Sequence, residues 1–273
     1  MKQKIKKNPV ISWIQKGKIP DNWSAFTGSS SKDIEASNTA RASFRNLIGS
    51  VHNKGVMYAT VPFIEAIIEA GEKLTEDKIW NIKDSYSGVL ITHNFTFMYE
   101  IHANESGEHG YKILVFNPNG NFVASLVQNP ELKTKGFLGN NKYVMQFAEE
   151  LKKLGSTNYL DEMRKFLYTQ VYVTLLFIRY AKVEEQVVKP RNKVHLQDCT
   201  YENDNDATIR IFNCTWFSEL VKSEGFAVRG HFRMQACGEG RSDRELIWID
   251  TFMKTGYTRD AIKKEYGNFK ELV

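Results

Sequence analysis

The stretches "GVLITHNFTFMYEI" (88–101) and "YKILVFNPNGNFVASLV" (111–127) decide the fold of this chain. Their apolar, β-branched and aromatic residues form runs of strand length between turn-forming residues. The segment "NPNGN" contains Asn119 followed by Gly120, the pair favoured in tight hairpin turns. We therefore expect three strands here, arranged as an antiparallel meander.

The residues on either side of this meander predict helices. Pro62 suits the first turn of one helix, Thr75 suits the N-cap of the next, and Gly55 offers a left-handed cap to the helix before them. The first 86 residues are thus expected to be helical after an irregular start that contains Trp13 and Trp23. Two more helices are expected at 141–154 and 158–187.

The segment "VVKPRNKVHLQDCTYENDND" (187–206) predicts a linker, because it is polar, contains a proline and ends in alternating Asn and Asp. It divides the chain into a domain at 1–190 and a module at 207–273. The predicted fold class is α+β: helices around an antiparallel sheet, followed by a small C-terminal αβ module with a basic β-hairpin.

Within this module, "ATIRIFN" (207–213) predicts a strand, and helices are expected at 214–225 and 258–269. The connection after the first strand is long enough for parallel pairing through a crossover. The two remaining strands, on either side of "CGEGRSDRE", are expected to form a hairpin.

The composition is that of an ordinary globular protein, with 273 residues of which 42% are hydrophobic and 25% charged. A formal charge of +5 allows an acidic partner, but 32 acids among 37 bases do not define a dedicated nucleic-acid binder. The most apolar run, at 171–178, is far shorter than the roughly 18 residues that suggest a membrane span. We expect no membrane partner.

Cysteine and histidine spacings predict neither a disulfide framework nor a metal site. Cys199, Cys214 and Cys237 form no C-x-x-C pair and leave an odd thiol, which favours a cytoplasmic protein. No P-loop, H-E-x-x-H or G-x-S-x-G motif is present in the sequence. We therefore expect no metal, no small-molecule cofactor and none of the familiar small-molecule enzyme classes.

The segment "VRGHFRMQACGEGRSDRELIWID" (228–250) contains the candidate binding surface. Side chains two apart in a strand share a face, so one face points to the core and the other is polar. Gly238 and Gly240 suit positive-φ positions of a turn. The core face comprises Val228, Gly230, Phe232 and Met234. The candidate nucleic-acid or acidic-partner residues are Arg229, His231, Arg233 and Gln235, with Arg241 and Arg244 in the loop.

Arginine holds phosphates and carboxylates well, because its guanidinium donates two parallel hydrogen bonds. An RNA backbone or an acidic peptide would satisfy this polar face. The plainer interpretation is a solvated sheet face whose arginines pair with nearby acids. These acids are Glu239, Asp243, Glu245 and Asp250.

His231 is the candidate catalytic residue, because imidazole titrates near neutral pH and a neighbouring arginine can hold a scissile phosphate. Such a site would cleave RNA by activating the 2′-hydroxyl of the RNA itself. It also needs a general acid, and only Glu239 or Glu245 is available, if the hairpin folds back. One histidine alone does not make a site. For Trp13, Trp23 and Trp248, buried packing is the default, and exposure would make them anchors of a peptide groove.

Residues 228–252 resemble the C-terminal signature of a family of type V-A anti-CRISPR proteins encoded on phages, plasmids and integrative elements. The resemblance covers about 25 residues and extends loosely over 207–260, and it does not include the first 190 residues. It implies that Arg229, His231 and Arg233 form the family's Arg/His strand and Trp248 its second-strand tryptophan. The family has a second histidine where this chain has Arg233, which puts a paired-histidine mechanism in doubt.

The resemblance implies recognition of a target's N-terminal peptide during translation and loss of its message. We therefore expect a counter-defence protein that binds a nascent polypeptide through its N-terminal part, at residues that the sequence does not identify. The basic hairpin would engage RNA, the ribosome or a decay factor. Two alternatives stay open: a stand-alone ribonuclease that uses His231, and a phage structural protein whose basic strand packs against a neighbour.

Overall fold

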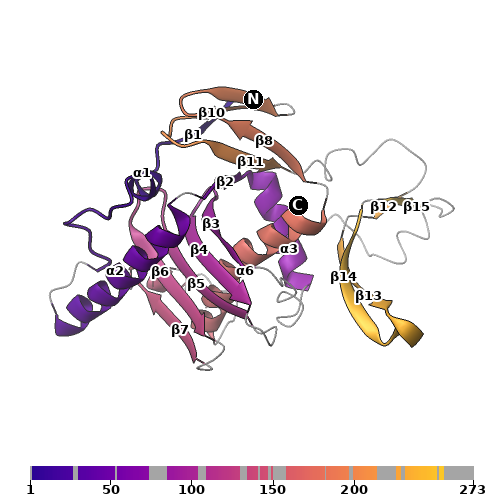
Figure 1. The fold of residues 1–273 in the computed structure, drawn as a ribbon, viewed down its shortest axis with the longest axis horizontal. Coiled ribbons are helices and arrows are strands. Elements are labelled where there is room, and N and C mark those ends of the chain that lie inside the picture. Colours follow the sequence, from indigo (N-terminus) through magenta and orange to yellow (C-terminus); the bar gives the residue numbers. More distant parts are fainter. Residues whose placement is uncertain are drawn as a thin grey trace.

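The fold is described from a computed structural model of the 273-residue chain. Its description covers residues 2–26, 30–52, 54–73, 85–103, 109–129, 134–140, 142–146, 149, 158–181, 183–196, 199–213, 226–228, 231–250 and 252–254. Within these residues the chain is an α+β protein with a large, mostly antiparallel sheet, as the sequence predicts (Figure 1).

The largest sheet has eight strands in the order β7-β6-β5-β4-β3-β2-β11-β8. Strands β3 to β7 form an antiparallel meander, β2 is parallel to both β3 and β11, and β8 is antiparallel to β11. The bounds are β2 Val56–Ala59, β3 Tyr86–Ile91, β4 Thr96–Ala103, β5 His109–Phe116, β6 Phe122–Asn129, β7 Thr134–Gly139, β8 Glu184–Val188 and β11 Ile209–Asn213.

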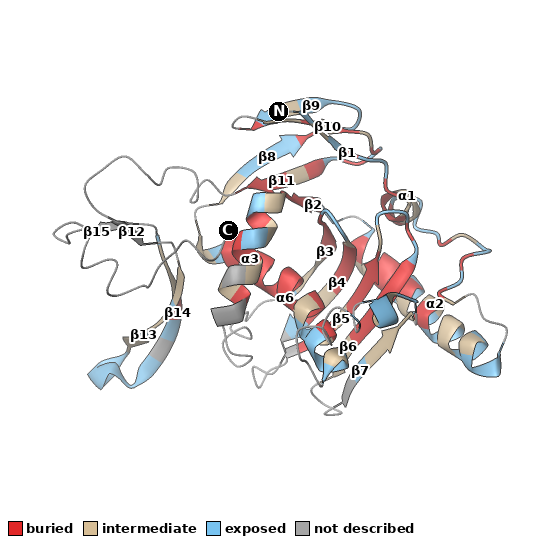
Figure 2. Cartoon of the chain, turned by 180° about the vertical axis from the view of Figure 1, so that it is seen from behind, coloured by how far each residue is buried: buried red, intermediate tan, exposed pale blue. Residues whose placement is uncertain are grey.

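Helices cover both faces of this sheet. Helices α1 (Pro9–Gln15) and α2 (Ser31–Val51) lie over one face, and α3 (Val61–Lys73) and α6 (Tyr159–Tyr180) over the other (Figure 1). In β4, Phe97 belongs to the core under α3 and α6, whereas Met98 belongs to the core under α1 and α2. Because both faces are buried, the central strands are almost continuously apolar (Figure 2).

The predicted meander is confirmed, with five strands, β3 to β7, where three were expected. The run at 88–101 folds as two strands, β3 and β4, because Thr92 and Phe95 close a turn through hydrogen bonds of 2.8 Å and 3.0 Å. The Asn119-Gly120 turn between β5 and β6 forms as predicted. Gly120 has a φ of 81° and its amide donates to the carbonyl of Asn117 at 2.9 Å.

The prediction of a linker at 187–206 was wrong. Strands β9 (Lys193–Leu196) and β10 (Cys199–Asn203) form a second sheet with β1 (Lys2–Ile5), in which β1 is parallel to β10 and β9 is antiparallel to it. Each strand is polar on one side only, because Val194, Leu196 and Tyr201 pack inward. Because the segment is polar on average, this alternation of polar and apolar residues was not recognised in the sequence.

The N-terminal prediction also needs correction. The irregular start contains β1 and α1, and the helical region is interrupted by β2. Helix α2 ends at Val51 with His52 as a right-handed C-cap, and Gly55 is not among the glycines with positive φ. Helix α6 ends at Tyr180, seven residues before the predicted 187, because Ala181 is extended and 184–188 pairs with β11.

The predicted strand at 207–213 forms as β11, but its predicted pairing was wrong. Both of its edges are occupied within the large sheet, by β2 and by β8, so a parallel pairing with the following strand does not occur. β11 therefore belongs to the sheet of the first domain rather than to a C-terminal module. The helix predicted at 141–154 is helical at 142–146. The predicted helices from Thr75, at 214–225 and at 258–269 lie outside the described residues.

Two pairs of strands follow β11. Strands β13 (His231–Cys237) and β14 (Asp243–Ile249) form the predicted hairpin, which lies beside the main body in Figure 1. Strands β12 (Phe226–Val228) and β15 (Phe252–Lys254) pair with each other in antiparallel orientation.

Candidate functional site

One face of the β13–β14 hairpin packs against helix α6. Leu246 is only 2% exposed, and Phe232, Met234 and Trp248 pack against the same core. The rings of Phe232 and Trp248 lie 5.2 Å and 4.8 Å from the ring of Phe177 in α6. The predicted inward direction of Phe232 and Met234 is confirmed, whereas Val228 lies in another strand, β12, and Gly230 lies outside the described residues.

The other face of the hairpin carries His231, Arg233 and Gln235, of which Arg233 and Gln235 are exposed. The register sets this row opposite a second row of β14 residues on the same face. Opposite His231, Arg233 and Gln235 lie Ile249, Ile247 and Glu245, respectively. The face is therefore a polar row beside a largely apolar one.

The remaining predicted site residues are distributed unevenly. Arg241 is exposed in the hairpin turn, far along the strand from His231. Arg244 lies in β14 opposite Ala236, but its side chain is outside the description, as is the whole of Arg229. The structure thus places Arg233, Gln235 and Arg241 on the exposed outside of one hairpin.

The glycine-rich loop is a hairpin turn, as predicted. Gly238 and Gly240 have φ values of 76° and 63°, and Arg241 also has a positive φ of 60°. A Cβ atom at Gly238 would lie 2.4 Å from a carboxylate oxygen of Asp243, and the positive φ at this position favours glycine. The turn contains a short 3-10 helix at Glu239–Arg241 and lacks the strand-to-helix geometry of a phosphate-binding loop.

The hairpin register separates His231 from the two acids considered for catalysis. Glu245 lies opposite Gln235, four residues along the strand from His231, a distance of about 13 Å at the usual rise. Glu239 lies in the turn beyond the end of β13. General acid–base catalysis needs both groups within hydrogen-bond reach of one substrate. This hairpin does not supply that geometry with either glutamate.

The described residues contain no group of three or more His, Cys, Asp and Glu side chains placed to hold a metal ion. Within the same residues, no helix is long and apolar enough to cross a membrane. Trp23 is buried, with its ring 5.1 Å from that of Phe44, and the ring of Trp13 lies 6.0 Å from the same phenylalanine. The expected buried packing is confirmed for Trp23, and Trp13 is partly buried against the same core.

A groove of about 390 Å³ lies between the N-terminal half of α2 and the last two strands of the meander. The helix supplies one wall and β6 and β7 supply the floor. Its walls and floor are lined by Lys32, Glu35, Ala36, Thr39, Ser43, Ser125, Val127, Gly136, Phe137 and Leu138. The volume is typical of ligand-binding clefts.

The chemistry of the groove is mixed. Val127, Phe137 and Leu138 provide apolar surface, and the hydroxyl groups of Thr39 and Ser43 provide hydrogen-bonding groups on the helix. Strand β7 is the last strand of the sheet in the described part of the chain. The free side of an edge strand presents unpaired amides and carbonyls, which an extended peptide can use.

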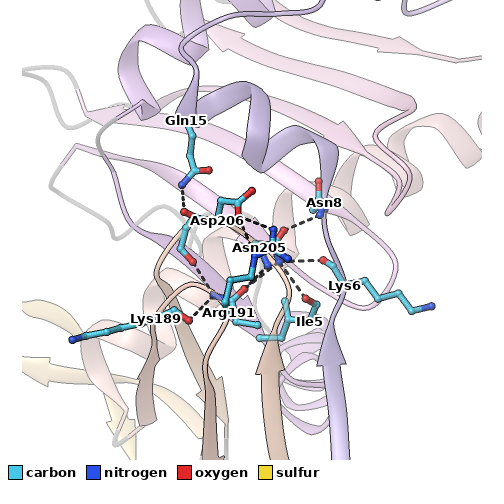
Figure 3. A network of polar contacts seen from close by, with 10 residues as sticks. Ile5, Lys6, Asn8, Gln15, Lys189, Arg191, Asn205 and Asp206 are labelled. Atoms are coloured by element: carbon cyan, nitrogen blue, oxygen red, sulfur yellow. Dashed lines mark hydrogen bonds and ion pairs between the residues drawn. The ribbon is translucent and has the colours of Figure 1, made fainter.

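A buried network of asparagines anchors the N-terminal strand to the chain near 205 (Figure 3). Asn205 accepts a hydrogen bond from the amide of Asn8 at 2.8 Å and donates to the carbonyls of Ile5 and Lys6 at 3.2 Å and 3.1 Å. Asn203 donates to Ala207 at 2.8 Å. The side-chain amides of Asn203 and Asn205 bond mainly to backbone groups. Their role is therefore structural, because these bonds hold β1 beside β10.

The groove was not predicted from the sequence. One signal was present, because Ala36, Thr39 and Ser43 recur at spacings of three and four residues and form a stripe of small side chains on α2. The sequence does not predict the floor of the groove, because the space there depends on the distance between α2 and strands β6 and β7.

No protein-family model, no curated protein and no solved structure matches this chain.

Proposed function

We propose that this protein recognises one specific polypeptide and lowers expression of the message that encodes it, as a counter-defence protein of a phage or another mobile element. The polypeptide is a nascent chain, and it binds in the groove between α2 and β7. The outer face of the β13–β14 hairpin engages RNA, the ribosome or a decay factor.

The groove is the observation that supports this proposal. An extended polypeptide can pair its backbone with an edge strand and place alternate side chains in a cleft beside it. The groove offers both features, since β7 is an edge strand of the described sheet and apolar side chains lie next to hydroxyl groups. A peptide reader also explains selectivity, because contacts to a phosphate backbone carry no sequence information.

The hairpin supports the second half of the proposal. Its apolar face packs against α6, which leaves Arg233, Gln235 and Arg241 exposed on the hairpin. The same segment carries the resemblance to the anti-CRISPR family. The separation of His231 from Glu239 and Glu245 favours binding at this surface over intrinsic RNA cleavage.

Expression of the protein in bacteria, followed by transcript profiling, identifies the messages that it depletes. The first codons of a depleted message are then recoded synonymously, and in a second reporter they are frame-shifted with minimal change to the RNA. We expect depletion to survive recoding and to be lost on frame-shifting. Escape of the recoded message, or continued depletion of the frame-shifted one, would show that RNA sequence is read instead.

Matched substitutions in α2 test the groove itself. Ala36→Trp fills the groove, whereas Ala42→Trp adds the same side chain at an exposed position of the same helix that does not line it. We expect message depletion to be lost with Ala36→Trp and kept with Ala42→Trp. Equal activity of the two variants would remove the groove from the proposal.

The hairpin is tested separately with an exposed arginine. Arg233→Gln should reduce message depletion while leaving peptide binding to the purified protein unchanged. Arg45→Gln, at an exposed position of α2, is the control with the same charge change. Loss of peptide binding with Arg233→Gln would instead show that the hairpin belongs to the peptide site.

A further inference from the structure

The small sheet of β1, β10 and β9 has an outward face that is rich in lysine. Ile5, Tyr201 and Leu196 are buried beneath this sheet, in the core that α2 covers. Because side chains alternate along a strand, their neighbours point outward. The resulting basic sheet face consists of the exposed Lys2, Lys4, Lys193 and His195 and the half-buried Thr200 and Glu202.

The single carboxylate of this face is surrounded by cations. Lys2 forms an ion pair with Glu202 at 2.9 Å. That hydrogen bond lowers the pKa of Glu202, and the charges of Lys2, Lys4 and Lys193 lower the pKa further. Lys4 also pairs with Asp204 at 3.8 Å, so these three lysines face two carboxylates and keep a net positive charge for a partner.

More cations lie around the rim. Arg191 bonds to Asp206 at 2.7 Å and thereby lowers the pKa of Asp206, to which the charges of Lys7 and Lys16 also contribute. Among the described residues, the face and the segments that flank it carry the cations Lys2, Lys4, Lys6, Lys7, Lys16, Lys189, Arg191 and Lys193 and the carboxylates Glu202, Asp204 and Asp206.

The composition of the basic sheet face indicates which class of polyanion it suits. The face contains no Phe, Tyr or Trp for stacking an unpaired base and no large apolar side chain for entering a bilayer, and its one imidazole, His195, is hydrogen-bonded to the Thr200 hydroxyl at 3.1 Å. Its cations repeat about 6.6 Å apart along a strand and about 10 Å apart across two strand spacings. Such a two-dimensional array of cations suits the regularly spaced phosphates of a duplex.

We propose that the basic sheet face binds the phosphate backbone of double-stranded RNA without reading its sequence. The choice of RNA over DNA rests on the proposed function, which places the protein at a translated message. The binding surface itself rests on the sheet, which joins lysines from the N-terminal strand to those from the segment at 189–193.

The test measures binding of the purified protein, without a tag, to a labelled RNA duplex over a series of salt concentrations. The variant Lys2→Gln/Lys4→Gln/Lys193→Gln removes three cations from the face. The control Lys54→Gln/Lys142→Gln/Lys165→Gln removes three exposed lysines elsewhere and has the same net charge. Each phosphate contact contributes roughly 0.9 to the slope of log affinity against log salt.

We expect the slope of the face variant to fall by about two to three, and that of the control to stay near the original value. Single Lys193→Gln should lower it by about one, which keeps the test valid if the triple variant unfolds. Equal losses in the two triple variants would overturn the proposal, as would tighter binding to a DNA duplex, polyglutamate or anionic phosphatidylserine vesicles. None of these outcomes depends on the groove or on message depletion, so failure here is distinct from failure of the proposed function.

Discussion

Phe177 in α6 and Trp248 in β14 lie with their ring centroids 4.8 Å apart and their planes at 55°. Phe177 is 1% exposed and also contacts Phe232 and Phe63. Such tilted aromatic pairs are favourable beyond the area that they bury. This contact joins the hairpin, and with it the surface proposed to engage RNA or a decay factor, to the main core.

The first prediction concerns this junction. Phe177→Ala should lower the free energy of unfolding by about 3–5 kcal/mol, because it leaves a cavity among three aromatic rings. Hydrogen exchange of residues 231–249 should accelerate more than exchange in β4. Leu160→Ala, at an exposed position of the same helix, serves as the control and should change stability by less than about 0.5 kcal/mol. Unchanged exchange in the hairpin would show that other contacts hold it.

The second prediction concerns the asparagine network. Asn205→Ala removes the acceptor of the Asn8 amide and the donor to two carbonyls, at a site that is 1% exposed. Unsatisfied buried groups cost about 1–3 kcal/mol each, so we expect a loss of about 2–5 kcal/mol in urea denaturation. Asn46→Ala, exposed on α2, is the control. A loss below about 1 kcal/mol for Asn205→Ala would mean that water replaces the side chain.

The third prediction concerns pH. The hydrogen bond from Arg210, at 2.8 Å to the second carboxylate oxygen, lowers the pKa of Glu185 below its ordinary 4.5. A lowered folded-state pKa adds stability that is fully present above 4.5 and is lost as pH falls through the folded value. The melting temperatures of the original protein and Glu185→Gln should therefore differ at neutral pH and converge in acid. Glu65→Gln reports the effect of removing an exposed carboxylate. A constant difference at every pH would contradict the expectation.

The fourth prediction compares two glycines. Gly120 has a φ of 81°, and an added Cβ would lie 3.1 Å from atoms of Pro9 and Trp13, so Gly120→Ala should lose about 1–3 kcal/mol. Gly49 lies in α2 with nothing within 4 Å of its added Cβ, so Gly49→Ala should gain about 0.5–1 kcal/mol. Chemical denaturation of the two variants measures both. A gain in stability, or no change, with Gly120→Ala would show that the β5–β6 turn tolerates a side chain.

The sequence by itself determined the elements whose signals are local. The β5–β6 turn follows from Asn119 and Gly120, because the positive φ of such a turn needs glycine at that position. The β13–β14 hairpin follows from its alternation and from Gly238 and Gly240, and Phe232 and Met234 pack inward as the alternation predicts.

Only the tertiary structure decided which distant segments meet. β1 pairs with β10 across about 200 residues, and β11 enters the large sheet between β2 and β8. Short strands that are polar on one side have weak local signals, and their pairing depends on partners elsewhere in the chain. The groove beside Ala36 and the basic sheet face with Lys4 and Lys193 arise in the same way, since each is built from segments that the sequence places far apart.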